Sequence, residues 1–174
     1  MEFRKAAQSD IDVITRIARE AAREEDNAWD EEYPSRAQFE ESLGCDGLYV
    51  AQEDGRVIAS VGIHPAESIF LRLPCWSGSH QKPCDICRLC VRPDLTGRHI
   101  AENLLRYALS DAAKENGYDS VHFIAAQSNK RANRLYSRMG FRCVGETNWI
   151  GTDWFCYETE LTEQHFSLAQ SHGL

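Results

Sequence analysis

A strand–glycine–helix segment over residues 89–105 has the residue types that bind phosphate groups. Leu89 to Val91 is an apolar run typical of the end of a buried strand, and Pro93 ends the strand ladder because it has no backbone N–H. Gly97 lies in the loop that follows, and apolar residues recur at helical spacing from Ile100 onward. The unpaired N–H groups and the positive dipole end of such a helix favour a phosphate.

A second group of reactive side chains is the run Cys84-x-x-Cys87-x-x-Cys90, with Cys75 and His80 upstream. Its spacing is similar to that of metal or iron–sulfur ligand sets. An extended strand over 86–91 predicts that Cys87 and Cys90 point to opposite faces and cannot share a metal. We therefore interpret them as small buried apolar residues and expect no metal. A loop zinc site of Cys75, His80 and Cys84 is the alternative.

The elements that must position these residues fit one domain over residues 1–161, with a polar tail over 162–174. The chain has 174 residues, 43% of them hydrophobic and 26% charged, which suits a globular domain with its own core. Hydropathy and turn residues predict the order β-α-α-β-β-β-α-β-α-β-β, an α/β fold with a mixed sheet. The predicted elements are strands at 1–6, 48–51, 57–63, 86–91, 121–126, 141–144 and 154–161, and helices beginning near residues 11, 36, 100 and 129.

Charge and composition narrow the partners. The net charge of −8 argues against nucleic acid or an anionic membrane as a partner, and it suits either a cationic amine or solubility alone. The sequence has no apolar run of membrane-spanning length and no signal-peptide pattern at its start, so we expect a cytoplasmic protein. Seven cysteines, an odd number, fit reduced thiols better than a disulfide framework.

The segment Asn129 to Phe141, NKRANRLYSRMGF, resembles the N-x-x-A-x-x-L-Y-x-x-x-G-F signature of the GNAT superfamily of N-acetyltransferases. The glycine loop falls where that family has V-x-P-x-x-[QR]-G-x-G-x-[GA], and the resemblance covers about residues 1–161. This chain departs from the pattern at Thr96, which replaces Gln or Arg, and at His99, which replaces Gly. The resemblance implies a mixed, mostly antiparallel sheet with a splayed central strand pair flanked by helices, in a monomer or homodimer.

The resemblance also implies that acetyl-CoA binds as co-substrate, mainly through backbone amides. A side chain at His99 is expected to crowd the phosphates or to require an unfavourable backbone angle. Arg98 is either a phosphate partner or a surface arginine. The implied cofactor-binding residues are Leu89, Cys90, Val91, Gly97, Arg98, His99, Ile100, Ala101, Glu102, Asn129 and Tyr136.

For acetyl transfer to an amine, Tyr136 is the candidate acid that protonates the departing thiolate, because a phenol with a pKa near ~10 is protonated at neutral pH. Asp85, at the start of the central strand, is the candidate base that takes the proton of the amine. His64 and His122 are the alternative bases, although structural roles suit them better. The amine acceptor is not identified; the segments 23–36, 65–84 and 148–154 are expected to contact it.

Two other functions stay open from the sequence. A non-catalytic acyl-CoA-binding or regulatory domain on the same fold is favoured by Thr96 and His99 and opposed by Tyr136. A metal-binding redox module built on the cysteine run is the third hypothesis.

Overall fold

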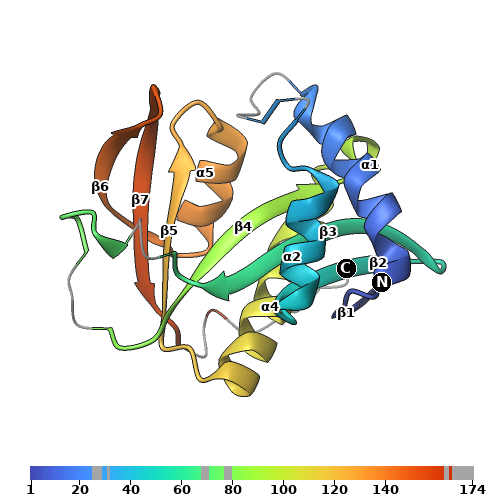
Figure 1. Ribbon diagram of the computed structural model, residues 1–174, viewed down its shortest axis with the longest axis horizontal. Helices are drawn as coiled ribbons and strands as arrows, with labels where there is room; N and C mark the ends of the chain where they lie inside the picture. The colour runs from blue at the N-terminus through green and yellow to red at the C-terminus, as the bar shows by residue number, and fades with distance from the viewer. Residues whose placement is uncertain (25–28, 31, 68–70, 77–79, 163–164, 166–174) are drawn as a thin grey trace, which may run out of the picture.

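The computed structural model describes residues 1–24, 29–30, 32–67, 71–76, 80–162 and 165, and it has the predicted element order (Figure 1). Seven strands form one sheet, with helices on both faces. The elements are β1 (Glu2–Lys5), α1 (Ile11–Ala22), α2 (Arg36–Gly44), β2 (Leu48–Glu53), β3 (Arg56–Pro65), β4 (Pro83–Val91), α4 (Ile100–Asn116), β5 (Ser120–Ala126), α5 (Lys130–Arg138), β6 (Arg142–Trp149) and β7 (Thr152–Glu160), with short 3-10 helices η1 (Gln8–Asp10) and η2 (Pro93–Leu95).

The sheet is mixed and opens in its middle. Its strand order is β1-β2-β3-β4-β5-β7-β6, and β4–β5 is the one parallel pair among the described strands. These two strands pair only at Pro83–Ser120 and Cys84–Val121, and farther along they separate, as Figure 1 shows. The predicted fold, a mostly antiparallel sheet with a splayed central pair, is confirmed.

Two apolar clusters attach the helices to opposite faces of the sheet. The isoleucines of α1 and Phe39 of α2 pack with Cys90 on one face. On the other face, Leu104 and Leu105 of α4 and Tyr136 of α5 pack against the strands. The helical spacing of apolar residues puts each helix on the sheet with one buried stripe, and this fixes where α4 and α5 begin.

The predicted helix starts are correct to within a residue or two. A turn of 3-10 helix precedes α1, and Asp10 accepts the backbone N–H of Ala7 at 2.8 Å. Asn129 caps α5, its Oδ1 accepting the N–H of Ala132 at 3.0 Å. Asn and Asp are good residues for such positions because a short side-chain oxygen can accept a backbone N–H.

The prediction that Cys87 and Cys90 face opposite sides of the sheet is wrong. Cys87 pairs with Gly62 and Cys90 with Ser60, so β4 advances three residues while β3 advances two. This β-bulge, at which Arg88 has φ of 52°, reverses the alternation and puts both thiols on the face of α1 and α2.

The predicted polar tail over 162–174 lies mostly outside the described residues. The described part includes His165, which is 1% exposed and stacks on Phe141 with ring centroids 5.8 Å apart. Among the described helices, none combines the length and the apolar composition needed to cross a membrane.

Candidate active site

A cavity of about 440 Å³ lies where β4 ends, α4 begins and α5 passes beside them. Its walls also include Ala21, Glu24 and Trp29 from the end of α1 and the segment after it. The predicted cofactor-binding residues that line it are Leu89, Cys90, Val91, Gly97, His99, Ile100, Ala101, Glu102 and Asn129, whereas Arg98 and Tyr136 are not among the lining residues.

The wall that the glycine loop and α4 provide is built from backbone in unusual conformations. Gly97 has φ of +83°, and His99, the residue before α4, has φ of 58° and ψ of 17°. Asn103 donates its N–H to His99 O at 3.1 Å, so the amides of residues 100–102 precede the first helical turn's bond and can bind an anion. The unfavourable backbone angle expected for His99 is present.

Glu102 puts a carboxylate beside this phosphate-type wall, and two arginines and one histidine surround it. His99 Nδ1 lies 3.3 Å from Glu102 Oε2, Arg138 Nε lies 3.3 Å from the same oxygen, and Arg106 Nη2 lies 3.1 Å from Oε1. Burial opposes ionisation of Glu102, yet the hydrogen bonds from Arg106, His99 and Arg138 hold its pKa below the usual range. The carboxylate is therefore neutralised by its neighbours and holds the loop, α4 and α5 together.

Arg98 points elsewhere. Its guanidinium makes a two-pronged ion pair with Glu53 of β2, with N–O distances of 2.9 and 3.1 Å, and this pair lowers the pKa of Glu53. Its role as a phosphate partner stays a prediction.

Sequence reasoning missed the arginines of α5. Arg131, Arg134 and Arg138 line the cavity from one helix. Their spacing of three and four residues puts them on one face, and this was the signal available in the sequence. They give the cavity a positive wall opposite the amides of α4.

Tyr136 and Asp85 are both buried, and the charge of Asp85 reaches Tyr136. Burial raises the pKa of Tyr136, and the charge of Asp85 raises it further. Burial also raises the pKa of Asp85, to about 8; Glu67 adds to this rise and Arg88 opposes it. Each residue is 6% exposed. A carboxyl group whose pKa lies near neutral can accept a proton, and a phenol that stays protonated can donate one, so each residue suits one half of proton transfer.

The two alternative bases are in different surroundings. His64 pairs with Asp85 in the β3–β4 register, and its Nε2 is 3.8 Å from Cys87 Sγ. Burial and the charge of Arg88 lower the pKa of His64 to about 4, so it is neutral at pH 7. His122 belongs to another cluster, with Glu158 and His80.

The cysteine predictions are met in part. All seven thiols are free, and burial raises the pKa of Cys90 to about 11, which fits a small apolar residue. The alternative zinc set is not assembled in the described residues: Cys84 packs in the core beside α4, Cys75 contacts Cys156, and His80 faces Glu158.

The open sheet, the helix that begins at its split and the cationic cavity wall form an anion-binding site in an α/β fold. A model described as the Acetyltransferase (GNAT) family matches residues 13–141, and the chain belongs to this family. The resemblance seen in the sequence is thereby confirmed.

Two curated relatives and two solved structures illustrate the similarity. N-acetyltransferase 8 of Rattus norvegicus is 30% identical over 101 residues, which are 58% of this chain and 41% of that protein; the Mus musculus protein of the same name is 29% identical over 106 residues, 61% and 43% of the two chains. The match therefore spans less than half the length of these relatives.

Among solved structures, a GNAT acetyltransferase of Streptococcus agalactiae gives a TM-score of 0.75 at 15% identity, over 92% of this chain and 95% of that one. The putative acetyltransferase yncA of Salmonella typhimurium, solved with acetyl-CoA, gives 0.70 at 18% identity, over 93% and 94%. At sequence identities this low, the structural similarity establishes that the fold is shared.

Proposed function

We propose that this protein transfers the acetyl group of acetyl-CoA to a primary amine by direct attack of the amine. The observation that carries the proposal is the convergence of two features on one cavity: the backbone at the start of α4 and the arginines of α5. The names of the two curated relatives and the acetyl-CoA bound to the Salmonella protein support the same reaction.

The residues present fit acetyl-CoA. A Cβ built at Gly97 meets no atom within 4 Å, so the cavity has open space at this glycine. Arg131 and Arg134 add positive charge to the same cavity, where phosphates would be bound by charge as well as by backbone. When bound, acetyl-CoA supplies an activated acetyl group and a thiolate leaving group.

The bulge in β4 is the proposed oxyanion site. Between the pairs Cys87–Gly62 and Cys90–Ser60, β4 contains Arg88 and Leu89, where β3 contains only Val61. A bulge leaves ladder groups without a strand partner, and Leu89 lines the cavity. An N–H at this point is in place to stabilise negative charge that develops on a carbonyl oxygen.

Proton transfer is assigned to the buried pair. Asp85, with a pKa near 8, accepts the proton of the attacking amine, directly or through water. Tyr136 stays protonated at neutral pH because burial raises its pKa, so it can donate to the leaving thiolate. His64, whose pKa is near 4, is the weaker base.

The acceptor is proposed to enter from the face of α1 and α2. Asp85 and Cys87 face that side. Burial raises the pKa of Tyr33, which lies close enough for Asp85, Cys87 and Arg88 to affect it as well. The carboxylate of Glu67, and that of Asp85 when it is ionised, favour a cationic amine. The predicted acceptor segments 23–36 and 65–84 lie in part outside the described residues.

Chromatographic detection of free CoA tests this function, since a thiol-colour assay would be confounded by seven cysteines. The protein is incubated with acetyl-CoA and pools of amines, and amine-dependent release of CoA is expected. Absence of CoA release with every amine pool, combined with tight binding of acetyl-CoA in a direct titration, would instead identify a non-catalytic acyl-CoA-binding domain.

A further inference from the structure

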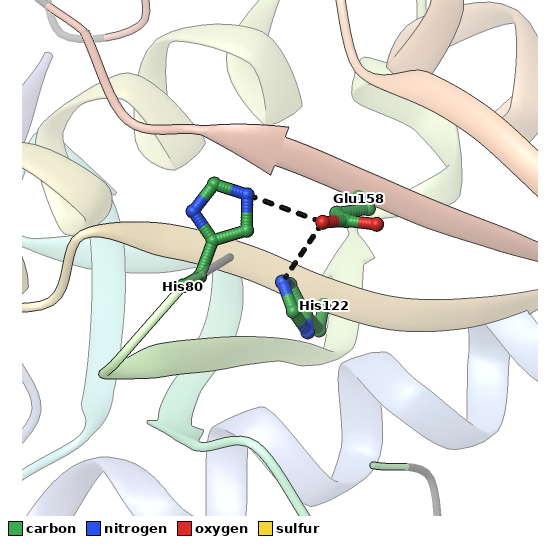
Figure 2. A group of neighbouring side chains, drawn as sticks. All are labelled: His80, His122 and Glu158. Atoms are coloured by element: carbon green, nitrogen blue, oxygen red, sulfur yellow. Dashed lines mark ion pairs between the residues drawn. The ribbon is translucent and has the colours of Figure 1, made fainter. Parts of the chain in front are cut away.

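Two histidines and one glutamate converge on the sheet face opposite α4 and α5, outside the site described above. His122 of β5 and Glu158 of β7 are direct partners in the strand register, and His80 reaches them from the segment before β4. Figure 2 shows both imidazole rings directed at the same carboxylate oxygen. Their three ligand atoms lie within 4.8 Å of one another, and Glu158 has no exposed surface.

One hydrogen bond explains part of this cluster and leaves His122 unexplained. His80 Nε2 lies 3.1 Å from Glu158 Oε1, a normal hydrogen-bond distance. His122 is 3% exposed, and neither of its ring nitrogens has a hydrogen-bond partner among the described residues. Its Nε2 is directed at Glu158 Oε1 from 3.7 Å, too far for a hydrogen bond. Buried imidazole nitrogens without a hydrogen-bond partner are rare, so a bound ligand would account for Nε2 of His122.

The distances match ligands that share one ion. With zinc bonds of about 2.0–2.1 Å to nitrogen and oxygen, two ligands at a tetrahedral angle lie roughly 3.3 Å apart. The observed separations of 3.1 and 3.7 Å lie on either side of that value. We propose that His80, His122 and Glu158 bind a divalent transition-metal ion of the zinc class, with a fourth position for water.

The donor set agrees with such an ion. Two neutral imidazoles and one carboxylate are ligands that zinc and ferrous ions accept, whereas magnesium and calcium prefer oxygen. The ion would also balance the charge of Glu158, which is otherwise costly to bury.

The site would fix a connection between strands. Trp76, in the same connection as His80, stacks on His122 with ring centroids 5.1 Å apart and planes inclined by 22°. Metal bonds from His80 to β5 and β7 would therefore attach the end of the β3–β4 connection to the sheet, close to where β4 begins. The expected role is structural, independent of acetyl transfer.

The experiment uses untagged full-length protein, stripped with a chelator, and titrated with zinc and with cobalt(II). Cysteine ligation is separated by spectrum, because thiolate-to-cobalt charge-transfer bands appear only when sulfur binds. The variants are His80→Ala, which removes one imidazole ligand, and Glu158→Gln, which keeps the shape of the side chain and removes its charge. His64→Ala, another half-buried histidine on a different cluster, and Cys75→Ser are the matched controls.

We expect one metal ion per chain, a cobalt spectrum without sulfur bands, and a zinc-dependent rise in Tm. Affinity should fall at least about 100-fold in His80→Ala and Glu158→Gln, because a lost ligand costs more than a lost second-shell partner. The controls should bind as the parent does. Absence of stoichiometric binding, equal affinity in the ligand variants, or a sulfur band that Cys75→Ser removes would each overturn the proposal.

Discussion

His99 and Glu102 face each other across the first turn of α4, with His99 Nδ1 3.3 Å from Glu102 Oε2. The contact occurs while His99 has a positive φ of 58°, a conformation that costs an ordinary residue about 1–2 kcal/mol. The family motif has glycine here, for which that conformation has no steric cost. The histidine side chain, 66% exposed, therefore stands beside the amides proposed to bind phosphate.

Replacing this side chain should strengthen cofactor binding. For His99→Gly we expect acetyl-CoA affinity to rise about threefold to tenfold, or about 0.7–1.4 kcal/mol, because the space beside the α4 amides opens. Stability should stay within about 1 kcal/mol of the parent, since relief of backbone strain is offset by glycine's unfolded-state entropy. Calorimetric titration measures the affinity. His99→Asn, which tolerates the positive φ but keeps a side chain, should show little of this gain; equal gains in both variants would refute crowding.

Removing the phenol oxygen should affect turnover only. Tyr136→Phe is expected to lower kcat by about 10²–10⁴, the usual range for a lost general acid, while acetyl-CoA affinity is unchanged. Tyr118→Phe, on the loop before β5 and outside the cavity walls, serves as the control. Parent-like turnover by Tyr136→Phe would mean that another group protonates the thiolate.

The proposed base predicts a specific pH profile. Asp85 must be ionised to accept a proton, so kcat/KM should rise up to about pH 8 and level off above it. Asp85→Asn should remove this limb, whereas Asp12→Asn, exposed on α1, should keep it. Profiles are measured with two acceptors of different pKa. A limb that moves with the acceptor reports the amine and would remove the support for Asp85.

The same carboxyl group should make the fold less stable in alkali. Because the pKa of Asp85 is raised in the folded state, its contribution to stability is complete below the unfolded-state pKa near ~4 and is lost as pH rises toward 8. The slope from this group is about 1.4 kcal/mol per pH unit between those limits. Urea unfolding should therefore show that the free energy of unfolding of Asp85→Asn, relative to the parent, is higher at pH 9 than at pH 5. An equal stability difference at both pH values would contradict the raised pKa.

The arginines of α5 should bind phosphate through charge. For Arg134→Ala we expect acetyl-CoA affinity to fall by about threefold to tenfold, with a weaker dependence on salt. Arg56→Ala, on β3 and outside the cavity walls, is the control for net charge. An equal loss in both variants would indicate a general charge effect with no specific contact.

The fold was predictable because its signals are local and repeated along the chain. Apolar periodicity identified the helices and the central strand. The spacing of Asn129 and Tyr136 in one motif, and of Val91 and Gly97 in the other, identified the family. The bulge at Arg88 was not predictable, since an extra strand residue leaves no compositional mark and reverses the alternation that the sequence implies.

The candidate site was predictable where one segment builds it and missed where several segments meet. The amides after Gly97 follow from a single stretch of chain. The convergence of His80, His122 and Glu158 depends on the register of β5 with β7 and on the path of the segment before β4, and nothing in the sequence specifies either. Asp85 could be named as a base, but its environment, set by Glu67 and Arg88, is a tertiary property.

The bulge in β4 also restricts how this enzyme family member can evolve. Before Arg88, the alternation of side chains along β4 points Asp85 toward α1 and α2. After Arg88, the bulge shifts this alternation by one residue, so Cys90 points to the same face. An insertion or deletion of one residue between Asp85 and the bulge would turn the carboxylate toward α4, into an apolar core with no acceptor. The number of residues between Asp85 and the bulge is therefore as constrained as the carboxylate itself.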